Sequence, residues 1–221
     1  MPLLRAGDNE ELMLTAAHVV GSLSTAHALD ERHVLLRTGV GAASSGDPVI
    51  GEVIESHPPE PCTTVELDAC LVRVRDHVSL GHVVRETITS GRARDLRGLD
   101  DLVPVFKRGI NTPSLTAGLL DPTPVIGRTK LLQPHGPPIV REYPNGWYVE
   151  GDGVPFAKLG DSGSIVVDED DCVVAMIVAI RSATPHAPGV EDPAFVIPIF
   201  NILDGLNVRL AGPDRPCTLS A

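Results

Sequence analysis

The chain has 221 residues, which is enough for one compact domain or for two small lobes that share an interface. Its 18 basic and 29 acidic side chains give a net charge of −11 without any cluster of Lys or Arg, so nucleic acid and anionic membrane are excluded as expected partners. No apolar run approaches the ~20 residues of a membrane helix, and no signal peptide is visible. We therefore expect a cytoplasmic protein.

The chain is divided into short segments by 21 glycines and 20 prolines. Runs rich in Val and Ile lie between them and are of strand length, which predicts an all-β sandwich or barrel. In chain order these runs are "HVLLR", "VIGEVI", "CLVRVR", "LVPVF", "PPIV", "WYVE", "SIVV" and "CVVAMIVAI". The polar stretch 89–101 predicts the connection between two β lobes. "PNG" at 144–146 predicts a turn, and 197–206 predicts a short helix.

The four cysteines, Cys62, Cys70, Cys172 and Cys217, have no CxxC spacing, so a zinc site is not indicated. We expect reduced, mostly buried thiols rather than disulfides. The acidic run "DEDD" at 168–171 is interpreted as a solvated hairpin turn rather than a calcium loop.

The sequence places Ser162 between an acid and glycines, in "GDSG" at 160–163, just before a β-branched run. A serine hydroxyl attacks a carbonyl only if it projects from a tight turn, a base removes its proton, and backbone N–H groups face the developing oxyanion. Flanking glycines permit such a turn. A glycine-rich hairpin without chemistry is an equally good interpretation of this motif alone.

His18 and Asp68 are candidate partners for such a serine. His18 lies in "LMLTAAHVV", where an apolar run breaks at the start of a predicted helical turn. This position can hold an imidazole at the end of a strand, facing a cleft. Asp68, in "ELDACLVRV", leads directly into a strand. A buried carboxylate in this place can hold the imidazole in the tautomer that a general base requires.

Together these stretches resemble the motifs of the trypsin-like (chymotrypsin-fold) serine proteases. "LTAAHVV", "DACLVRV" and "GDSGS" occur in that family's order, at intervals of 50 residues (68 − 18) and 94 residues (162 − 68). Residues 105–120 resemble the strand pair that opens the family's second lobe, and 194–206 resemble its last strand and closing helix. Val19 and Lys158 stand where secreted animal members have half-cystines, so the chain resembles a bacterial-type member that lacks the family disulfides.

The resemblance implies an all-β fold of two six-stranded antiparallel β-barrels with a short C-terminal helix. We expect an N-terminal lobe over 1–98 with His18 and Asp68, a C-terminal lobe over 99–210 with Ser162 and the helix, and a tail over 211–221. Only 17 residues precede His18. This leaves open whether the first barrel lacks its first strand or whether a partner chain or an upstream segment completes it.

The resemblance also implies a Ser-His-Asp triad, in which Ser162 attacks, His18 carries the proton and Asp68 orients His18. The N–H groups of Gly160 and Ser162 would form the oxyanion hole, and neither a metal nor an organic cofactor has a role. Phe156, Val178 and Ala179 match the pocket for the residue before the scissile bond. Their apolar character favours a small or apolar side chain there.

Several alternatives stay open. Phe156 fits ordinary core packing equally well, and Arg181 near the rim could instead select an acidic residue. Ile177 stands where many members have a serine that supports the aspartate, and Asp161 has no obvious partner in the sequence. The first functional hypothesis is a serine endopeptidase that cuts a protein or peptide. The others are a catalytically weak or silent protease-fold module that binds a peptide or partner within a larger assembly, and a hydrolase of small esters.

Overall fold

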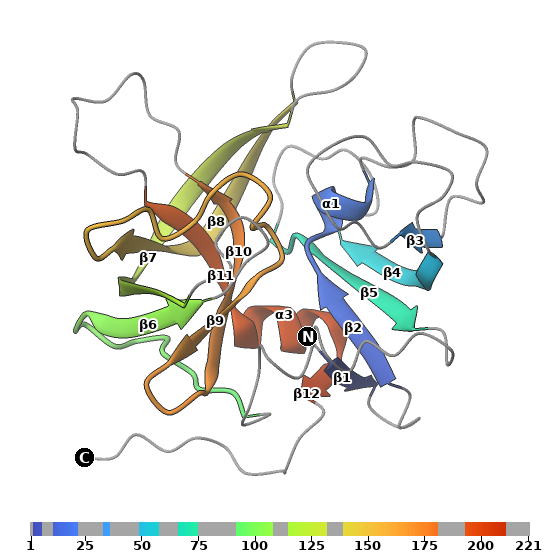
Figure 1. The fold of residues 1–221 in the computed structure, drawn as a ribbon, viewed down its shortest axis with the longest axis horizontal. Coiled ribbons are helices and arrows are strands. Elements are labelled where there is room, and N and C mark those ends of the chain that lie inside the picture. The colour runs from blue at the N-terminus through green and yellow to red at the C-terminus, as the bar shows by residue number, and fades with distance from the viewer. Residues whose placement is uncertain are drawn as a thin grey trace.

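The computed structural model describes residues 2–5, 11–21, 33–35, 49–57, 66–74, 92–107, 115–131, 139–180 and 193–210. Two β lobes lie side by side, and helix α3 (Ile199–Leu206) lies between their lower ends (Figure 1). The other helix of the described residues is the single-turn α1 (Ala17–Gly21). The predicted all-β class with a short C-terminal helix is confirmed.

The second lobe is a closed antiparallel barrel with the strand order β10-β11-β8-β7-β6-β9. Its strands are β6 (Val103–Lys107), β7 (Thr116–Leu131), β8 (Ile139–Gly151), β9 (Ile165–Asp168), β10 (Val173–Ile180) and β11 (Ala194–Pro198). Closure removes the open edges that would otherwise expose unpaired backbone groups. The predicted turn at 144–146 is wrong, because these residues lie inside β8, which pairs with β7 through shifts of register. The turn residues serve a local irregularity of the strand instead.

The first lobe is a six-stranded antiparallel sheet with the order β12-β1-β2-β5-β4-β3. Its strands are β1 (Pro2–Arg5), β2 (Glu11–Thr15), β3 (His33–Leu35), β4 (Val49–His57), β5 (Ala69–Val74) and β12 (Val208–Leu210). Among the described residues no pairing joins β3 to β12, so this sheet is not closed as the second one is. β12, which pairs with β1, comes from the C-terminal end of the described chain, within the segment predicted for the second lobe.

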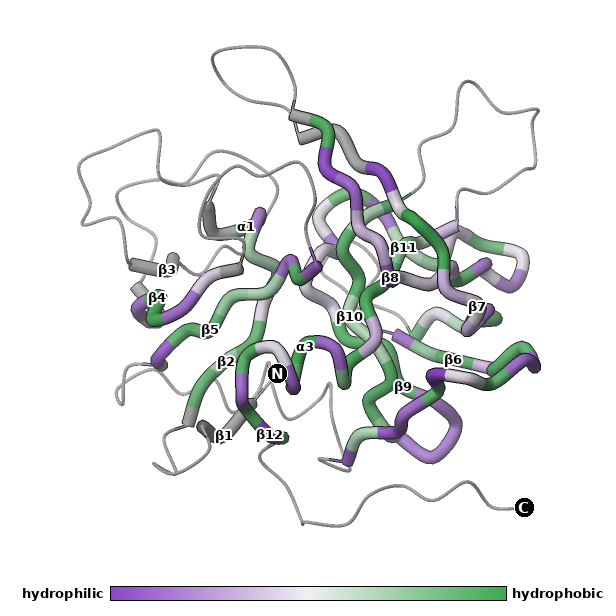
Figure 2. The backbone as a smooth tube through the Cα atoms, turned by 180° about the vertical axis from the view of Figure 1, so that it is seen from behind, coloured by the Kyte–Doolittle hydropathy of each residue, from purple (hydrophilic) through white to green (hydrophobic). Residues whose placement is uncertain are grey.

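One hydrophobic cluster joins the two lobes. It contains Leu12 and Leu71 of the first lobe and Phe195 of the second, together with Ile202 and Leu206 of α3. The apolar residues of α3 recur at helical spacing and lie buried, and Asn207 ends the helix in the left-handed conformation. Seen from behind, the apolar residues concentrate along β9, β10 and β11 (Figure 2). The lobes therefore share an interface made by the closing helix.

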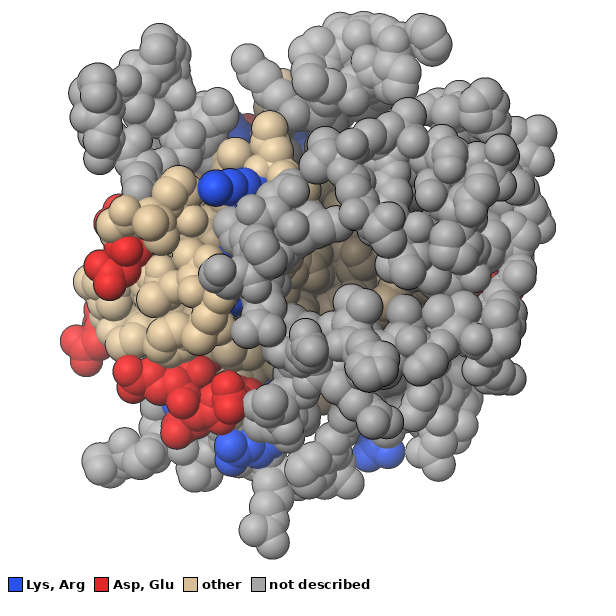
Figure 3. Space-filling view, viewed as in Figure 1, with Lys and Arg blue, Asp and Glu red and all other residues tan. Residues whose placement is uncertain are grey.

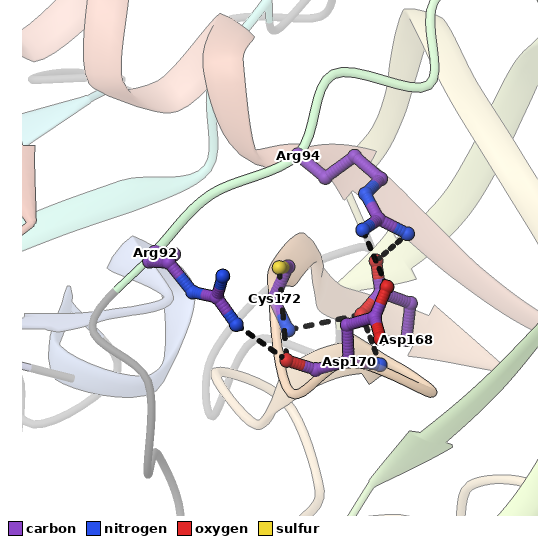
Figure 4. A network of polar contacts seen from close by, with 5 residues as sticks. All are labelled: Arg92, Arg94, Asp168, Asp170 and Cys172. Carbon is purple, nitrogen blue, oxygen red and sulfur yellow. Dashed lines mark hydrogen bonds and ion pairs between the residues drawn. The ribbon is translucent and has the colours of Figure 1, made fainter. Parts of the chain in front are cut away.

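The predicted connection between the lobes is anchored on the second lobe (Figure 4). Val173 at the start of β10 accepts a hydrogen bond from the Arg94 N–H at 2.9 Å and donates one to the Arg92 carbonyl at 2.8 Å. The Arg94 guanidinium lies 2.9 Å from an Asp168 oxygen and 2.7 Å from an Asp170 oxygen. The acidic run does form the β9–β10 turn, but Asp168 is buried and paired rather than solvated.

Acidic side chains also gather on the second-lobe side of the surface (Figure 3).

Cys172 is disulfide-bonded, so the prediction of a reduced thiol is wrong for this residue; Cys62 and Cys217 lie outside the described residues. Cys70 is free and buried, as predicted. No helix in the described ranges is long and apolar enough to cross a membrane. The same ranges contain no group of three or more His, Cys, Asp or Glu side chains that could hold a metal ion.

Candidate active site

His18 and Asp68 lie together at one end of the first-lobe sheet. β2 pairs with β5 so that Thr15 faces Cys70, which brings the residues after β2 next to those before β5. His18 Nδ1 lies 2.7 Å from Asp68 Oδ2, and the His18 backbone N–H donates to Asp68 Oδ1 at 2.9 Å. One carboxylate thus holds both the imidazole and the start of α1.

The Asp68 carboxylate is fully buried, and burial alone would raise its pKa. The hydrogen bond and charge attraction of the His18 ring, the His18 N–H and the Tyr143 hydroxyl outweigh burial, so the pKa of Asp68 lies below its ordinary value of 3.8. Burial and the nearby Asp68 charge raise the pKa of the Cys70 thiol to about 12. At neutral pH the pair therefore consists of an ionised carboxylate beside an imidazole, and Cys70 stays a protonated thiol.

Tyr143 is a third partner, which sequence reasoning missed. Its hydroxyl donates to Asp68 Oδ2 at 2.8 Å from β8 of the second lobe. No sequence signal distinguishes this tyrosine, because it lies 75 residues from Asp68 and precedes the wrongly predicted turn. Ile177, which stands where the resembling family often has a supporting serine, lies buried in the second-lobe core. The hydrogen bond that Asp68 accepts from the second lobe comes instead from Tyr143 in β8.

Ser162 lies in a turn between β8 and β9 that begins and ends with left-handed glycines, Gly160 at φ 96° and Gly163 at φ 86°. Residues with a side chain rarely adopt these angles, so the turn requires glycine at both places. Two backbone hydrogen bonds with Ile177 fix the far side of the turn. The Gly163 N–H donates to the Ile177 carbonyl at 2.8 Å, and the Ile177 N–H donates to the Ser164 carbonyl at 2.9 Å. The serine is thereby held against β10.

The near side of the turn is fixed by Asp161, for which the sequence offered no obvious partner. Its Oδ2 lies 2.5 Å from Lys107 Nζ of β6 and accepts the Lys158 N–H at 2.9 Å. Both charged side chains are fully buried. The sequence did hold a signal for Lys107, because this lysine shares the inward alternation of β6 with Val105. An internal ammonium group thus neutralises the acid next to Ser162.

The serine turn packs directly against the segment that carries His18. A Cβ atom on Gly163 would lie 2.8 Å from Thr15 Oγ1 and 3.0 Å from the Ala16 nitrogen. Glycine is therefore needed for this close approach as well as for its backbone angle. The Ser162 hydroxyl donates to the Val178 carbonyl at 3.0 Å, and no hydrogen bond joins it to His18 in the described part of the chain.

The backbone N–H groups of Gly160 and Ser162 make no hydrogen bond to any described residue, whereas the Asp161 N–H between them donates to Lys158 at 3.0 Å. An oxyanion hole needs N–H groups that are not used elsewhere and that lie beside the nucleophile, one of them on the serine itself. The assignment stays a prediction.

The three residues predicted to form the specificity pocket are buried or half-buried in the second lobe. Phe156 is fully buried in the second-lobe core, and Val178 is buried in the cluster that joins the lobes. Ala179 is half-buried against that same cluster. Core packing therefore accounts for the position of Phe156, and the pocket role of all three residues stays a prediction. Arg181 lies outside the described residues.

No protein-family model matches the chain, and no match was found among curated proteins. Among solved structures, a glutamic-acid-specific serine protease is 17% identical with a TM-score of 0.53, covering 95% of this chain and 90% of its own. Nocardiopsis protease is 16% identical with a TM-score of 0.52, covering 95% and 89%. Thermobifida fusca protease A is 15% identical with a TM-score of 0.52, covering 96% and 89%. The chain therefore has the chymotrypsin-like fold found in these bacterial proteases.

Proposed function

We propose that the chain is a serine endopeptidase that cleaves a protein or peptide through an acyl-enzyme intermediate. The observation that carries the proposal is the His18–Asp68 pair, with an Nδ1–Oδ2 distance of 2.7 Å, beside a serine turn that packs on the same segment. A base oriented by a buried carboxylate next to a projecting serine is the arrangement that nucleophilic acyl transfer requires.

In the proposed reaction Ser162 Oγ forms a bond to the scissile carbonyl carbon while its proton passes to His18 Nε2. The C–N bond then breaks, and His18 returns that proton to the leaving amine. Water attacks the ester in the same way, His18 takes and returns a proton, and Ser162 is regenerated with release of the acid. Asp68, ionised and fully buried, stabilises the positive charge that His18 carries between these steps.

The N–H groups of Gly160 and Ser162 would receive the oxyanion of each tetrahedral intermediate. Such donors typically contribute on the order of 100- to 1000-fold in rate. The Lys107–Asp161 ion pair supports this role because it holds the side chain of the residue between Gly160 and Ser162. Its ammonium group comes from inside the same lobe, so cleavage of the chain is not needed to create it.

The proposed preference is for a small or apolar residue before the scissile bond, through Phe156, Val178 and Ala179. The apolar character of these side chains is what supports it. Action in the cytoplasm without a metal or organic cofactor is also part of the proposal. A partner chain or upstream segment that completes the first lobe would join β3 or β12, the two edges of its described sheet.

A second candidate function is a catalytically weak or silent module that binds a peptide or partner. The hydrogen bond from Ser162 Oγ to the Val178 carbonyl favours it, because the nucleophile is directed to a backbone acceptor rather than to His18. Catalytic hydrogen bonds are often absent before substrate binds, so this observation alone does not exclude the first candidate.

The test is covalent labelling of the purified full chain with a fluorophosphonate probe, with the adduct located by mass spectrometry. Labelling at Ser162 that is lost in Ser162→Ala and in His18→Ala is the expected result. An unlabelled wild-type chain that still binds a peptide ligand would favour the silent module. A panel of peptides and small esters then separates peptide hydrolysis from ester hydrolysis.

A further inference from the structure

The hydroxyl of Tyr143 reaches across the lobe interface to the carboxylate that holds His18. Tyr143 lies in β8 of the second lobe, and Asp68 lies just before β5 of the first. Their oxygen atoms are 2.8 Å apart, and both residues are almost completely buried. A buried charge is stable only where donors replace the water that it has lost. Tyr143 is therefore part of what allows Asp68 to stay ionised inside the protein.

The hydrogen-bond donors described around Asp68 divide unequally between its two carboxylate oxygens. Oδ1 accepts the backbone N–H of His18 at 2.9 Å. Oδ2 accepts both the His18 ring at 2.7 Å and the Tyr143 hydroxyl at 2.8 Å. The oxygen that orients the imidazole is thus the one that Tyr143 fixes from the opposite lobe. Without the hydroxyl, rotation of the carboxylate would be opposed by His18 alone.

The Tyr143 ring is itself held in place by a packed aromatic group. Its centroid lies 5.6 Å from that of Phe195 in β11, which in turn lies 5.6 Å from the ring of Tyr148. Phe195 occupies space that side chains at Gly127 and Gly146 would fill, since a Cβ on either would lie within 2.4 Å of it. Gly127 faces Tyr143 across β7 and β8, next to a shift of register. Such irregularities re-aim a side chain relative to a regular strand.

A second contact from the same lobe acts on the neighbouring residue. A Cβ on Gly205 of α3 would lie 2.2 Å from Leu67 Cδ1, so the helix packs closely against the residue before Asp68. The side chain of Leu67 is therefore contacted by α3, and the Asp68 carboxylate by β8. The position of the His18–Asp68 pair depends on how the lobes meet.

We propose that Tyr143 is a positioning residue, whose hydroxyl holds the Asp68 carboxylate in the orientation in which it accepts the His18 ring. The proposal rests on the proposed function for its effect on rate, but its geometric part concerns the His18–Asp68 pair alone. It makes the base of the first lobe dependent on a hydroxyl of the second. Ile177, with an apolar side chain, supplies no donor for this purpose.

The test compares Tyr143→Phe with Tyr148→Phe, two variants that each remove one phenol oxygen beside Phe195. Circular dichroism and thermal unfolding establish that both variants fold. Removing the group that orients a metal-bound histidine typically costs 10- to 100-fold in activity, and we take this range as the guide for a histidine oriented by a carboxylate. We expect fluorophosphonate labelling of Ser162 to slow about tenfold in Tyr143→Phe at neutral pH, and to stay within about twofold of wild type in Tyr148→Phe.

A readout other than rate separates positioning from packing. The Tyr143 hydroxyl is one of the donors that lower the pKa of Asp68, because it stabilises the ionised carboxylate. The midpoint of the Asp68 titration, followed by NMR and assigned with Asp68→Asn, should move to higher pH in Tyr143→Phe and not in Tyr148→Phe. Among the described residues that contact Asp68, the His18 ring and the neutral Cys70 thiol are the other titratable groups.

A titration midpoint and a labelling rate that both match the Tyr148→Phe control would overturn the proposal. A wild-type chain that shows no labelling of Ser162, but whose Asp68 midpoint still shifts in Tyr143→Phe, would remove the proposed function and leave the positioning of the pair intact. The two failures are therefore distinguishable.

Discussion

The two lobes differ in how they hold their share of the candidate site. The second lobe is a closed barrel, and its Ser162 turn is fixed by groups of the same lobe, Lys107 on one side and Ile177 on the other. The first lobe is a sheet that is open in the described residues, and its Asp68 is contacted by Tyr143 and, through Leu67, by α3. One strand of this sheet, β12, follows α3 in the chain and pairs with β1.

This difference assigns separate tasks to the lobes. The nucleophile belongs to a self-supporting barrel, whereas the base and its carboxylate are placed by contacts that cross the interface. A change in the packing between the lobes should therefore alter the base before it alters the nucleophile.

The largest effect is expected for Asp68→Asn. An amide in place of the carboxylate cannot stabilise a charged His18 ring and favours the wrong tautomer, so Ser162 labelling should slow by about 10⁴-fold. Labelling kinetics at neutral pH measure this. A loss of less than about tenfold, in a folded variant, would show that the pair does not act as a base for Ser162.

The same substitution has a pH signature in stability. Hydrogen bonds and charge attraction lower the pKa of Asp68 below 3.8 in the folded chain, despite burial. The ionised group therefore contributes stability that is fully present above the unfolded value, near 3.8, and is lost as the pH falls toward the folded-state pKa. Urea unfolding of the wild type and Asp68→Asn should show a difference in free energy that shrinks on acidification below this value.

The second lobe is tested by Lys107→Met. Removing one member of a fully buried ion pair leaves the Asp161 charge uncompensated, which typically costs about 3 to 5 kcal/mol of unfolding free energy. We also expect fluorophosphonate labelling of Ser162 to slow in this variant, because Asp161 fixes the serine turn. Denaturant unfolding and labelling report the two effects.

Arg128→Met is the matched control for that experiment. Arg128 of β7 pairs with Glu142 of β8 at 2.8 Å, but both side chains are well exposed. Exposed pairs contribute about 0 to 1 kcal/mol. Equal losses for the two variants would mean that the buried pair has no special role in the barrel.

How far the sequence predicts this site follows from the range of each interaction. The sequence predicts His18, Asp68 and Ser162 because each stands in a local motif, in a recognisable chain order. Lys107 could have been found from its inward position in β6. Tyr143 could not, because its contact with Asp68 joins distant strands and depends on how the lobes meet.

The wrong predictions have similar physical origins. The "PNG" at 144–146 carries the local signal of a turn, but pairing with β7 on one side keeps it within β8. Cys172 has no CxxC spacing to another cysteine, so no local pattern marks it as a half-cystine. At 144–146, pairing with a neighbouring strand thus overrides a local pattern.

A smaller effect on labelling is expected for Gly146→Ala, which would disturb the Phe195 ring that packs against Tyr143. The added Cβ would lie 1.9 Å from Phe195 Cζ, and overpacking of this kind costs about 1 to 3 kcal/mol. Because Phe195 supports Tyr143, labelling should slow at a temperature where the variant is still folded. Asn145→Ala, at the exposed neighbouring position, is the control and should behave as wild type.

The smallest effect is expected on the connection between the lobes, where Arg94 and Arg97 offer a matched pair. Arg94 binds Asp168, whose side chain is 2% exposed, and Arg94→Gln should cost about 1 to 3 kcal/mol by leaving that acid underpaired. Arg97 binds Asp95 where both side chains are about 40% exposed, and Arg97→Gln should cost no more than about 0.5 kcal/mol. Both lie outside the His18–Asp68 pair, so Ser162 labelling of the folded variants should equal that of wild type. If Arg94→Gln instead slows labelling while thermal unfolding is unchanged, the linker also sets the alignment of the lobes, and the second lobe is less self-supporting than its closed barrel indicates.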